Sequence, residues 1–328
     1  MKHILNKLFE HQTLSEQDAY GVLTRIGKGD FNPAQIAAFL TVYLMRNISV
    51  AELTGFRNAL LDLCLKVDLS DFNTIDVCGT GGDGKDTFNI STLSAFVIAG
   101  AGYKVAKHGN YGVSSSCGSS NVLEHLGYEF TNNKSSLKTQ LDKANFCMMH
   151  APLFHPAMKN VAPVRKELGI KTFFNMLGPL VNPSNPQNQL VGVFNLEIAR
   201  IYNYLLQSSD KKYTILHSLD GYDEISLTGK FKALSNSGEI LLSPEDIGFK
   251  TQKQADIFGG NTVKDAAKIF INVLNNECTP AQKNAVLANS SFAIQCFEPN
   301  KTLAECTSIA KESIDSGRAI KCLKGIMN

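Results

Sequence analysis

The chain has 328 residues, of which 44% are hydrophobic, and its 32 basic and 30 acidic residues give a formal net charge of +2. A chain of this length can bury a substantial core as one large domain or two ordinary ones. The balanced charge argues against a global electrostatic footprint for nucleic acid or an anionic membrane, so an anionic ligand needs a local site.

The cysteines and the N-terminus indicate a protein of a reducing compartment. The 8 cysteines are dispersed, with no CxxC pair and no zinc-type spacing, which favours buried free thiols. The first residues mix charged and polar side chains into the apolar ones, and no apolar run reaches the length of a membrane span. We therefore expect a cytoplasmic globular enzyme with neither a membrane nor a nucleic acid as its partner.

The first seventy or so residues are predicted to be helical. Capping-box patterns occur at Thr13–Glu16 and Ser49–Glu52, and the pair Asn32-Pro33 is a further helix start. After Ser49, apolar residues recur at helical spacing and form one stripe. Internal packing is the simplest interpretation of this stripe. A subunit interface is the alternative, because small helical subdomains often bury a surplus apolar face against a second copy.

From about Asn73 the pattern changes to short apolar strands that alternate with helices. Such alternation predicts a largely parallel sheet covered by helices, with ligands bound at the carboxyl ends of the strands. In chain order the elements are Thr74–Val77, Thr92–Ala101, Tyr103–Ala106, Ser119–Leu126, Phe146–Met149, Leu190–Phe194, the helix Glu197–Gln207 and the strand Tyr213–His217.

Two regions complete the expected organisation. Residues 155–165 are predicted to form a helix, and Asn175–Pro183, rich in proline and asparagine, is predicted to be a loop. Further helix starts stand at Thr279-Pro280 and Thr302–Glu305. The expected fold class is α/β, with a small all-helical N-terminal domain and a larger α/β domain around a mostly parallel central sheet. The domain boundaries are 1–72 for the helical domain, a joining segment near 155–187, and 73–154 with 188–328 for the α/β domain.

The run from Asp76 to Thr92 places glycines, hydroxyls and an acid after an apparent strand. Gly79–Gly84 fits GxGxxG, but the next strand leads into Lys107 instead of an acid, which argues against a dinucleotide site. Gly79–Lys85 also has the spacing of a P-loop, but Asp86 stands where a magnesium-binding Ser or Thr is required. What remains is an anion site built from backbone N–H groups and from Thr87, Asn89, Ser91 and Thr92.

Two later segments extend this chemistry. Lys107–Ser120 supplies a cation and a second run of glycines and serines one strand later, which suggests a ligand with two phosphate groups. Asp223-Glu224 follows a predicted strand. Adjacent acids in a loop are usually solvated, but a diphosphate ligand calls for Mg²⁺, which is held by a few carboxylates and by ligand oxygens.

In these motifs the chain resembles the anthranilate phosphoribosyltransferase family. The motifs occur in the order and spacing of that family over most of the chain, and their combination is more specific than any one of them. They are Gly79–Asp83 with Thr87–Thr92, Lys107–Asn110 with its serine run, His155–Met158 with Pro163–Arg165, Asn175–Pro183 and Asp223-Glu224.

The resemblance implies transfer of the phosphoribosyl group of phosphoribosyl pyrophosphate to the amine of anthranilate, in tryptophan biosynthesis, with Mg²⁺ as the cofactor. The main demand is stabilisation of the leaving pyrophosphate, to which Mg²⁺ and Lys107 would contribute. The implied substrate-binding residues are Gly79, Gly82, Asp83, Thr87, Asn89, Ile90, Ser91, Thr92, Lys107, His108, Gly109, Asn110, Ser115, Ser119 and Arg165.

Further roles follow from the same resemblance. Ser91, Asp223 and Glu224 would hold Mg²⁺, and the catalytic residues would be Lys107, Asn110 and Arg165. Arg165 suits the anthranilate pocket because a guanidinium can bind a carboxylate bidentately. The pocket residues implied are Asn110 and Arg165, with Gly79 nearby and with His108, His155 and Pro179 as weaker candidates.

The chain departs from the family pattern at two positions in or next to Lys107–Ser120, which is called the second anion segment below. Tyr111 stands where the family commonly has Arg, and Asn121 stands where it commonly has Asp. The first change removes a positive charge close to the proposed phosphate site. It therefore bears on how the 5′-phosphate is anchored, and not on the class of reaction.

Two alternatives remain open at this point. A pyrimidine nucleoside phosphorylase-like enzyme shares this fold and a related glycine-rich motif, but its phosphate site resembles Lys-His-Ser, and it has no need of metal-binding acids. A non-catalytic relative that binds nucleic acid or acts as a scaffold is the other, against which the near-neutral charge speaks. With the resemblance, the apolar stripe predicts a homodimer through the N-terminal helices.

Overall fold

The computed structural model of the chain describes residues 1–112 and 117–327 and divides into two compact units. The helical unit comprises Met1–Val67 and Ala151–Asn185, and the α/β unit comprises Asp68–His150 and Pro186–Asn328.

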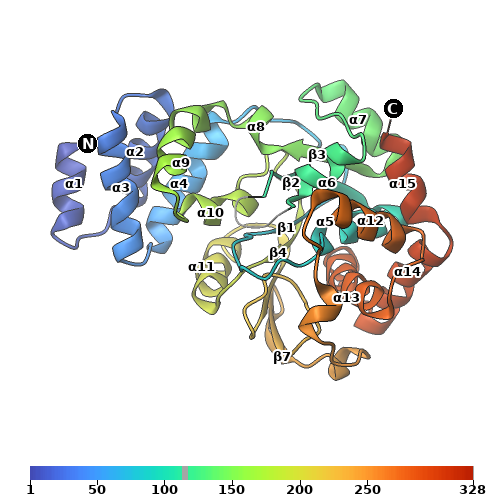
Figure 1. The fold of residues 1–328 in the computed structure, drawn as a ribbon. Coiled ribbons are helices and arrows are strands. Elements are labelled where there is room, and N and C mark those ends of the chain that lie inside the picture. Colours follow the sequence, from blue (N-terminus) through green and yellow to red (C-terminus); the bar gives the residue numbers. More distant parts are fainter. Residues whose placement is uncertain (113–116, 328) are drawn as a thin grey trace. The chain divides into compact units, whose positions relative to one another are not determined.

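The described secondary structure of the helical unit consists of helices (Figure 1), which confirms the predicted all-helical N-terminal part. The predicted loop Asn175–Pro183 is wrong in part, because short helices cover most of it. The elements are α1 (Lys2–Phe9), α2 (Glu16–Lys28), α3 (Pro33–Met45), α4 (Val50–Leu63), α8 (Ala151–Phe154), the 3₁₀ helix η1 (Pro156–Asn160), α9 (Ala162–Leu168), α10 (Phe174–Leu177) and the 3₁₀ helix η2 (Gly178–Leu180).

Side-chain caps fix the starts of helices α3 and α4. At α4, Ser49 and Glu52 form the predicted capping box, in which each side chain accepts a hydrogen bond from the other residue's backbone N–H. At α3, Asn32 and Gln35 do the same ahead of a proline in the first turn. Such reciprocal caps satisfy N–H groups that the helix itself cannot pair.

The capping box predicted at Thr13–Glu16 is wrong. Helix α2 begins at Glu16, and its N-cap is Ser15, whose hydroxyl accepts a hydrogen bond from the N–H of Asp18. The N–H of the preceding Leu14 donates to the Glu52 carboxylate instead, at 2.9 Å. This tertiary contact holds residue 14 outside the helix, so the start lies two residues later than the pattern suggested.

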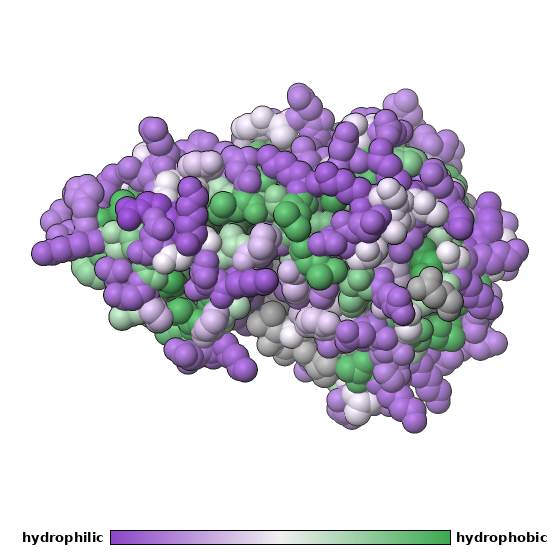
Figure 2. Space-filling view, turned by 90° about the horizontal axis from the view of Figure 1, so that it is seen from above, coloured by the Kyte–Doolittle hydropathy of each residue, from purple (hydrophilic) through white to green (hydrophobic). Residues whose placement is uncertain are grey.

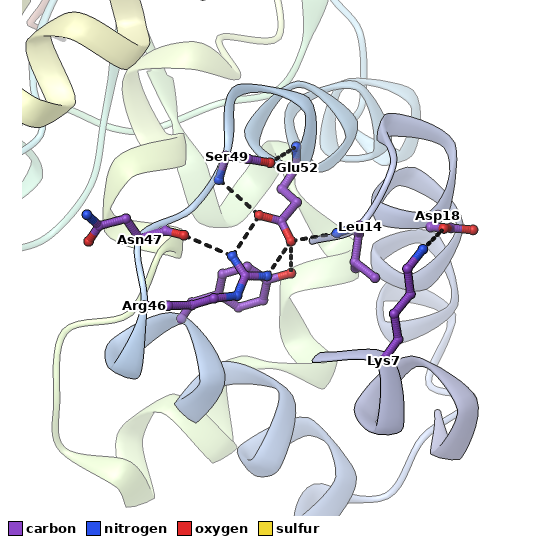
Figure 3. A network of polar contacts seen from close by, with 8 residues as sticks. Lys7, Leu14, Asp18, Arg46, Asn47, Ser49 and Glu52 are labelled. Carbon is purple, nitrogen blue, oxygen red and sulfur yellow. Dashed lines mark hydrogen bonds and ion pairs between the residues drawn. The ribbon is translucent and has the colours of Figure 1, made fainter. Parts of the chain in front are cut away.

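Glu52 is a buried acid that joins several segments of the helical unit (Figure 3). Its Oε1 accepts hydrogen bonds from the Leu14 N–H at 2.9 Å and the Tyr43 hydroxyl at 3.2 Å. Its Oε2 accepts from the Ser49 N–H at 2.9 Å, and the Arg46 guanidinium donates to both oxygens. A buried carboxylate is tolerated only with such complete pairing.

The α/β unit is built on a seven-stranded sheet in the described residues, in the order β3-β2-β1-β4-β5-β6-β7. The first five strands of this order run parallel, and the hairpin of β6 and β7 adds two antiparallel strands at one edge. The mostly parallel sheet confirms the prediction, whereas the hairpin was not predicted. The strands are β1 (Thr74–Gly79), β2 (Lys104–Gly109), β3 (Phe146–His150), β4 (Asn188–Gly192), β5 (Lys212–Ser218), β6 (Phe231–Ser235) and β7 (Gly238–Leu242).

The helices of this unit cover the sheet, and those of the C-terminal part gather around α5 (Figure 1). Helix α5 contacts β1 and β2, and α13 contacts β4 and β5. Nearly every residue of α5 is buried, so its apolar composition reflects a position inside the core. The helices are α5 (Ile90–Gly100), α6 (Ser119–His125), α7 (Lys134–Ala144), α11 (Leu196–Leu206), α12 (Val263–Leu274), α13 (Pro280–Phe297), α14 (Leu303–Asp315) and α15 (Arg318–Ile326), with the 3₁₀ helices η3 (Glu245–Ile247) and η4 (Gln254–Ile257).

The face seen in Figure 2 is mainly hydrophilic, with smaller apolar areas. None of the helices among the described residues combines the length and the apolar character required to cross a membrane.

The strand order places a topological switch point at the centre of the sheet. After β1 the chain adds β2 and β3 on one side, and it later adds β4 on the other side of β1. In open sheets of this kind, ligands bind outside the carboxyl ends of the strands at such a point. A ligand site is therefore expected at the carboxyl ends of β1 and β4.

Candidate active site

Two glycines mark the carboxyl ends of β1 and β4. Gly79 and Gly192 are paired across the two strands, and the N–H of Thr80 donates to the carbonyl of Gly192 at 2.9 Å. A Cβ on Gly192 would lie 1.5 Å from the carbonyl oxygen of Asp223, and a Cβ on Gly79 would lie 2.4 Å from Oδ2 of the same residue. The segment after β5 thus passes so close to these strand ends that side chains are excluded there.

Asp223 and Glu224 are held at this edge by backbone donors. The N–H of Gly81 donates to Asp223 Oδ2 at 2.7 Å, and the N–H of Ser91, in the first turn of α5, donates to Glu224 Oε1 at 2.7 Å. The N-terminal end of a helix favours a negative charge. The predicted metal-binding set of Ser91, Asp223 and Glu224 therefore comes together, around a small pocket that Gly79 also lines.

Supporting contacts fix the acidic segment from the other side. The Ser218 hydroxyl donates to the carbonyl of Glu224 at 2.7 Å. The buried Asn289 of α13 accepts from the N–H of Ile225 at 3.0 Å and donates to its carbonyl at 2.9 Å. Ser218, Asn289 and Gly192 were not predicted as site residues. The polar run Asn289–Ser291 in the buried part of α13 was a local signal for a polar contact there.

The two acids have unusual protonation equilibria. Burial, followed by the charges of Glu224 and Asp83, raises the pKa of Asp223 well above its ordinary value. Burial and the charge of Asp83 raise the pKa of Glu224 to about 7, although the hydrogen bond from the Ser91 N–H works in the opposite direction. Acids crowded in this way are stabilised in their ionised form by a cation.

The donor set fits Mg²⁺. Among residues 1–112 and 117–327, no three His, Cys, Asp or Glu side chains come together as a metal cage. Mg²⁺ is commonly bound through one or two carboxylates, with water and substrate phosphates completing its octahedral shell. Asp223 and Glu224 offer that pair of carboxylates beside the Ser91 hydroxyl.

The glycine-rich loop after β1 has the backbone that an anion site requires. Gly81, Gly82 and Gly84 have φ values of +63°, +80° and +71°, a region that favours glycine. The Asp83 carboxylate accepts a hydrogen bond from the N–H of Lys85 at 3.1 Å, which closes a tight turn. The hydroxyl oxygen of Thr80 is buried without a hydrogen-bond partner in the described residues, so it is available to a ligand.

The segment that leads into α5 carries the remaining residues predicted in the first motif. Thr87 bridges to Phe258 in antiparallel fashion, whereas Ile90 and Thr92 are buried. The Asn89 amide donates to the carbonyl of Cys117 at 3.0 Å and so links the first glycine-rich segment to the second. Its Oδ1 is buried and has no hydrogen-bond partner among the described residues, which suits a ligand with hydroxyl groups.

The second segment begins on β2. Lys107 is buried, and its ammonium donates to the carbonyl of Val77 on β1. The buried His108 donates its backbone N–H to Asp76 at 3.0 Å. A Cβ on Gly109 would lie 2.4 Å from the Ser119 hydroxyl oxygen, so α6 begins directly beside the end of β2. Asp76 was not among the predicted residues, although it opens the first motif.

Asn110 and Asn121 organise the residues that follow. The carbonyl of Asn110 accepts from the Ser120 N–H at 3.1 Å and from the Ser119 hydroxyl at 3.3 Å. The Asn121 side-chain oxygen accepts from the N–H groups of Gly112 and Gly118, at 2.9 and 3.0 Å. Ser115, also predicted to bind substrate, lies outside the described residues.

Arg165 lies on α9 of the helical unit. One of its terminal nitrogens donates to the Asn175 side chain at 3.3 Å, and its guanidinium lies 5.3 Å from the centre of the Phe174 ring. Its Nε is buried without a hydrogen-bond partner in the described residues, and burial lowers the pKa of the group. It forms no ion pair with a described residue, so this guanidinium can take an external carboxylate. His155 and Pro179 of the same unit are buried.

Comparison with known proteins supports an enzyme. The helical bundle domain of a glycosyl transferase family matches residues 2–64, and the a/b domain of the same family matches residues 71–320. Fold and site thus define a glycosyl transferase built from these two domains.

Individual relatives narrow this class. The anthranilate phosphoribosyltransferase of Cytophaga hutchinsonii is 59% identical over 324 residues, which is 99% of each chain. The crystal structure of the Thermus thermophilus enzyme of that name has a TM-score of 0.91 at 31% identity and matches 98% of this chain and 97% of its own. The Saccharomyces cerevisiae enzyme, solved with phosphoribosyl pyrophosphate and Mg, has a TM-score of 0.90 at 28% identity, with 98% and 95% covered. The chain belongs to the anthranilate phosphoribosyltransferase family.

This result confirms the family predicted from the motifs. A second yeast structure contains 4-fluoroanthranilate and matches with a TM-score of 0.88 at 26% identity, over 98% of this chain and 95% of the yeast chain.

Proposed function

We propose that the chain transfers the phosphoribosyl group of phosphoribosyl pyrophosphate to the amino group of anthranilate and releases pyrophosphate, a step of tryptophan biosynthesis. The observation that carries this proposal is the placement of Asp223 and Glu224, which backbone N–H groups of Gly81 and Ser91 hold beside the glycine-rich loop. The membership in the family and the ligands of the yeast structures support it.

The phosphoribosyl pyrophosphate site is assigned to the carboxyl ends of β1 and β2. Backbone N–H groups of the glycine-rich loop would bind phosphate oxygens, and the free Oδ1 of Asn89 would accept a hydrogen bond from a ribose hydroxyl. Lys107 adds a buried positive charge to this edge. The residues proposed for this ligand are Gly79, Gly82, Asp83, Thr87, Asn89, Ile90, Ser91, Thr92, Lys107, Ser115 and Ser119.

Mg²⁺ held by Ser91, Asp223 and Glu224 would neutralise charge on the pyrophosphate as it leaves. The chain's own contribution is to hold the ribose and the amine in place, so that nitrogen attacks C1′ with inversion while the bond to pyrophosphate breaks. The proton lost by the new amine can pass to pyrophosphate or water, so the reaction does not need a side-chain base. His108 stays a weaker candidate for that role.

The residues proposed for anthranilate are those that the family resemblance implies, namely Asn110 and Arg165, with Gly79 nearby and with His108, His155 and Pro179 as weaker candidates. Arg165 has no acidic partner among the described residues, which supports this assignment. A half-buried guanidinium is strongly stabilised by an anion that pairs with it. The carboxylate of anthranilate is such an ion.

We also propose a homodimer through the helical unit, in the cytoplasm. Several large apolar side chains of this unit are exposed, among them Phe9 at 60% and Met45 at 84%. A second copy that covers such residues would remove apolar area from water. Sedimentation of the full chain at micromolar concentration tests the dimer, and a monomer would contradict it.

The fluorescence of anthranilate provides the test of the activity. Consumption of anthranilate is followed with phosphoribosyl pyrophosphate and Mg²⁺ for the wild type, for Arg165→Ala and for Lys166→Ala, an exposed neighbour on α9. Loss of a charge-assisted contact of about 1.5–3 kcal/mol predicts that Arg165→Ala raises the KM for anthranilate about 10- to 100-fold. The KM for phosphoribosyl pyrophosphate should change far less, and Lys166→Ala should resemble the wild type. Wild-type turnover of thymidine and phosphate without metal would refute the proposal.

A further inference from the structure

Lys85 has a fixed place in the glycine-rich loop that the proposed function does not use. Its backbone N–H donates to the Asp83 carboxylate at 3.1 Å, and it stands between Gly84 and Asp86, which have φ values of +71° and +49°. The carbonyl of Asp86 accepts from the N–H of Gly259 at 2.8 Å. The backbone on both sides of Lys85 is therefore held.

The side chain of Lys85 extends toward the acidic segment. Its Nζ lies 4.8 Å from the centre of the Tyr222 ring, and a Cβ on Gly221 would lie 3.5 Å from its Cε. Tyr222 is buried, and it directly precedes Asp223. A cation over an aromatic ring is attracted by the negative face of the ring.

The ammonium of Lys85 forms no ion pair with a described residue, although acids surround it in sequence and space. Asp223 directs an oxygen to the N–H of Gly81, and Glu224 directs one to the N–H of Ser91. These carboxylates are engaged with backbone donors, so the ammonium, which lies over the ring of Tyr222 next to the acidic pair in sequence, is left for an external anion.

We infer that Lys85 binds the pyrophosphate group of phosphoribosyl pyrophosphate and shares with Mg²⁺ the task of neutralising it. This inference rests on the proposed function and adds a residue to its site. A lysine ammonium is a compact point charge on a flexible stem, which suits a diphosphate whose oxygens move apart as the bond to ribose breaks. The glycine spacing that fails as a P-loop at Asp86 nevertheless places a lysine beside phosphate oxygens, as a P-loop does.

Sharing of charge has a measurable consequence. When a protein cation and Mg²⁺ neutralise the same anion, loss of the protein cation lowers the affinity for the anion most at low Mg²⁺ concentration. A lysine that only braces the loop would instead affect binding equally at every Mg²⁺ concentration.

Calorimetric binding of inorganic pyrophosphate and of phosphoribosyl pyrophosphate, each at several Mg²⁺ concentrations, tests the inference. The variants are Lys85→Met, which keeps the length of the side chain, Lys85→Arg, which keeps the charge, and Lys138→Met. Lys138 is the control because it is an exposed lysine of α7 that is already paired with Asp71 and is not among the proposed site residues. Thermal unfolding of each variant reports on the fold.

We expect Lys85→Met to bind pyrophosphate about tenfold more weakly at limiting Mg²⁺, with a deficit that shrinks as Mg²⁺ rises. Lys85→Arg and Lys138→Met should stay close to the wild type. The inference is overturned if Lys85→Met binds as tightly as the wild type at every Mg²⁺ concentration. It is also overturned if Lys85→Met and Lys85→Arg lose affinity equally and unfold at lower temperature. A wild type that binds neither ligand would instead refute the proposed function.

Discussion

The backbone N–H of Gly81 donates a hydrogen bond of 2.7 Å to Oδ2 of Asp223, although 142 positions separate the two residues. This bond joins the loop after β1 to the loop after β5. Both loops stand at the carboxyl edge of one sheet, because β4 lies between β1 and β5 and all three strands run parallel. The shape of the proposed metal site therefore depends on how closely these two loops approach one another.

Gly192→Ala should disable the site. A Cβ at this position would lie 1.5 Å from the backbone oxygen of Asp223, which cannot move without its neighbours. We expect a loss of about 1–3 kcal/mol in the free energy of unfolding, from overpacking. Binding of phosphoribosyl pyrophosphate with Mg²⁺ should fall below detection in calorimetry, because the displaced segment carries both acids.

Gly21→Ala is the matched control for that change. Gly21 lies inside α2, and a Cβ there would meet no atom within 4 Å. Alanine is the better helix former by about 0.5–1 kcal/mol, so this variant should unfold at the same or a higher temperature. If Gly192→Ala kept both its stability and its ligand binding, the close packing at the end of β4 would not be required for the function of the site.

The affinity for Mg²⁺ should depend on pH through Glu224. Its pKa is about 7 without a metal, so below pH 7 a proton occupies the carboxylate that Mg²⁺ needs. Affinity should fall as the pH falls through about 7, by up to about tenfold per pH unit. The stability of the metal-free protein should depend on pH in the opposite direction to the Mg²⁺ affinity. A raised carboxyl pKa makes the folded state less stable as the pH rises from 4.5 to about 7.

Glu224→Gln separates the proton effect from other causes. The amide copies the protonated acid, so the variant should bind Mg²⁺ weakly and should lose the part of the pH dependence that Glu224 contributes. The pH dependence that comes from Asp223, whose pKa is also raised, should remain. Calorimetry in buffers of different ionisation enthalpy should also detect release of a proton when the wild type binds Mg²⁺. No proton release near neutral pH would contradict the raised pKa of Glu224.

Asn121 should control the second anion segment through one oxygen atom. This oxygen accepts hydrogen bonds from Gly112 and Gly118, and a Cβ on Gly118 would lie 2.2 Å from the nitrogen of Gly112, so the chain passes close to itself here. Asn121→Ala removes both bonds, at about 0.5–1.5 kcal/mol each. We expect a KM for phosphoribosyl pyrophosphate that is higher by about tenfold.

Asn121→Asp keeps an oxygen acceptor and adds a negative charge. It should retain the thermal stability of the wild type, yet bind phosphoribosyl pyrophosphate less well at low salt, because the new charge repels phosphate. Equal stability and equal KM values for all three proteins would show that the two hydrogen bonds do not matter to the site.

Local sequence was sufficient for the features that depend on neighbours in the chain. The capping box of Ser49 and Glu52 spans four residues and the helix start at Thr279-Pro280 spans two, and the structure confirms both. The family could be recognised because its motifs combine rare residue types in a fixed order. The alternation of strands and helices likewise predicted the parallel part of the sheet.

Features that depend on distant contacts could not be predicted in this way. The start of α2 is shifted because Leu14 donates to Glu52, 38 positions later. The need for glycine at Gly192 arises from the backbone of Asp223, and the role of Asn289 arises from Ile225. The hairpin of β6 and β7 pairs with β5, the strand before it in the chain, but its position at the edge depends on the order of all the strands of the sheet.

The pair of Arg46 and Glu52 should make the stability of the helical unit depend on pH. Burial alone would raise the pKa of Glu52, but the hydrogen bonds from Arg46 and from the Leu14 and Ser49 N–H groups outweigh it, so the pKa lies below its ordinary value of 4.5. A lowered carboxyl pKa contributes stability that is present above 4.5 and is lost as the pH falls below it. Thermal unfolding between about pH 3 and 7 should show this loss in the wild type.

Arg46→Met tests the pair at neutral pH. The substitution leaves the fully buried Glu52 side chain without its cation, and breaking a buried pair costs about 3–5 kcal/mol. Lys66→Met is the control, because Lys66 is 64% exposed in its pair with Asp62, and exposed pairs of this kind contribute about 0–1 kcal/mol. The double variant Arg46→Met, Glu52→Gln should recover part of the loss, since no buried charge remains. If Arg46→Met unfolded at the wild-type temperature, the backbone donors and the Tyr43 hydroxyl would be sufficient to stabilise Glu52.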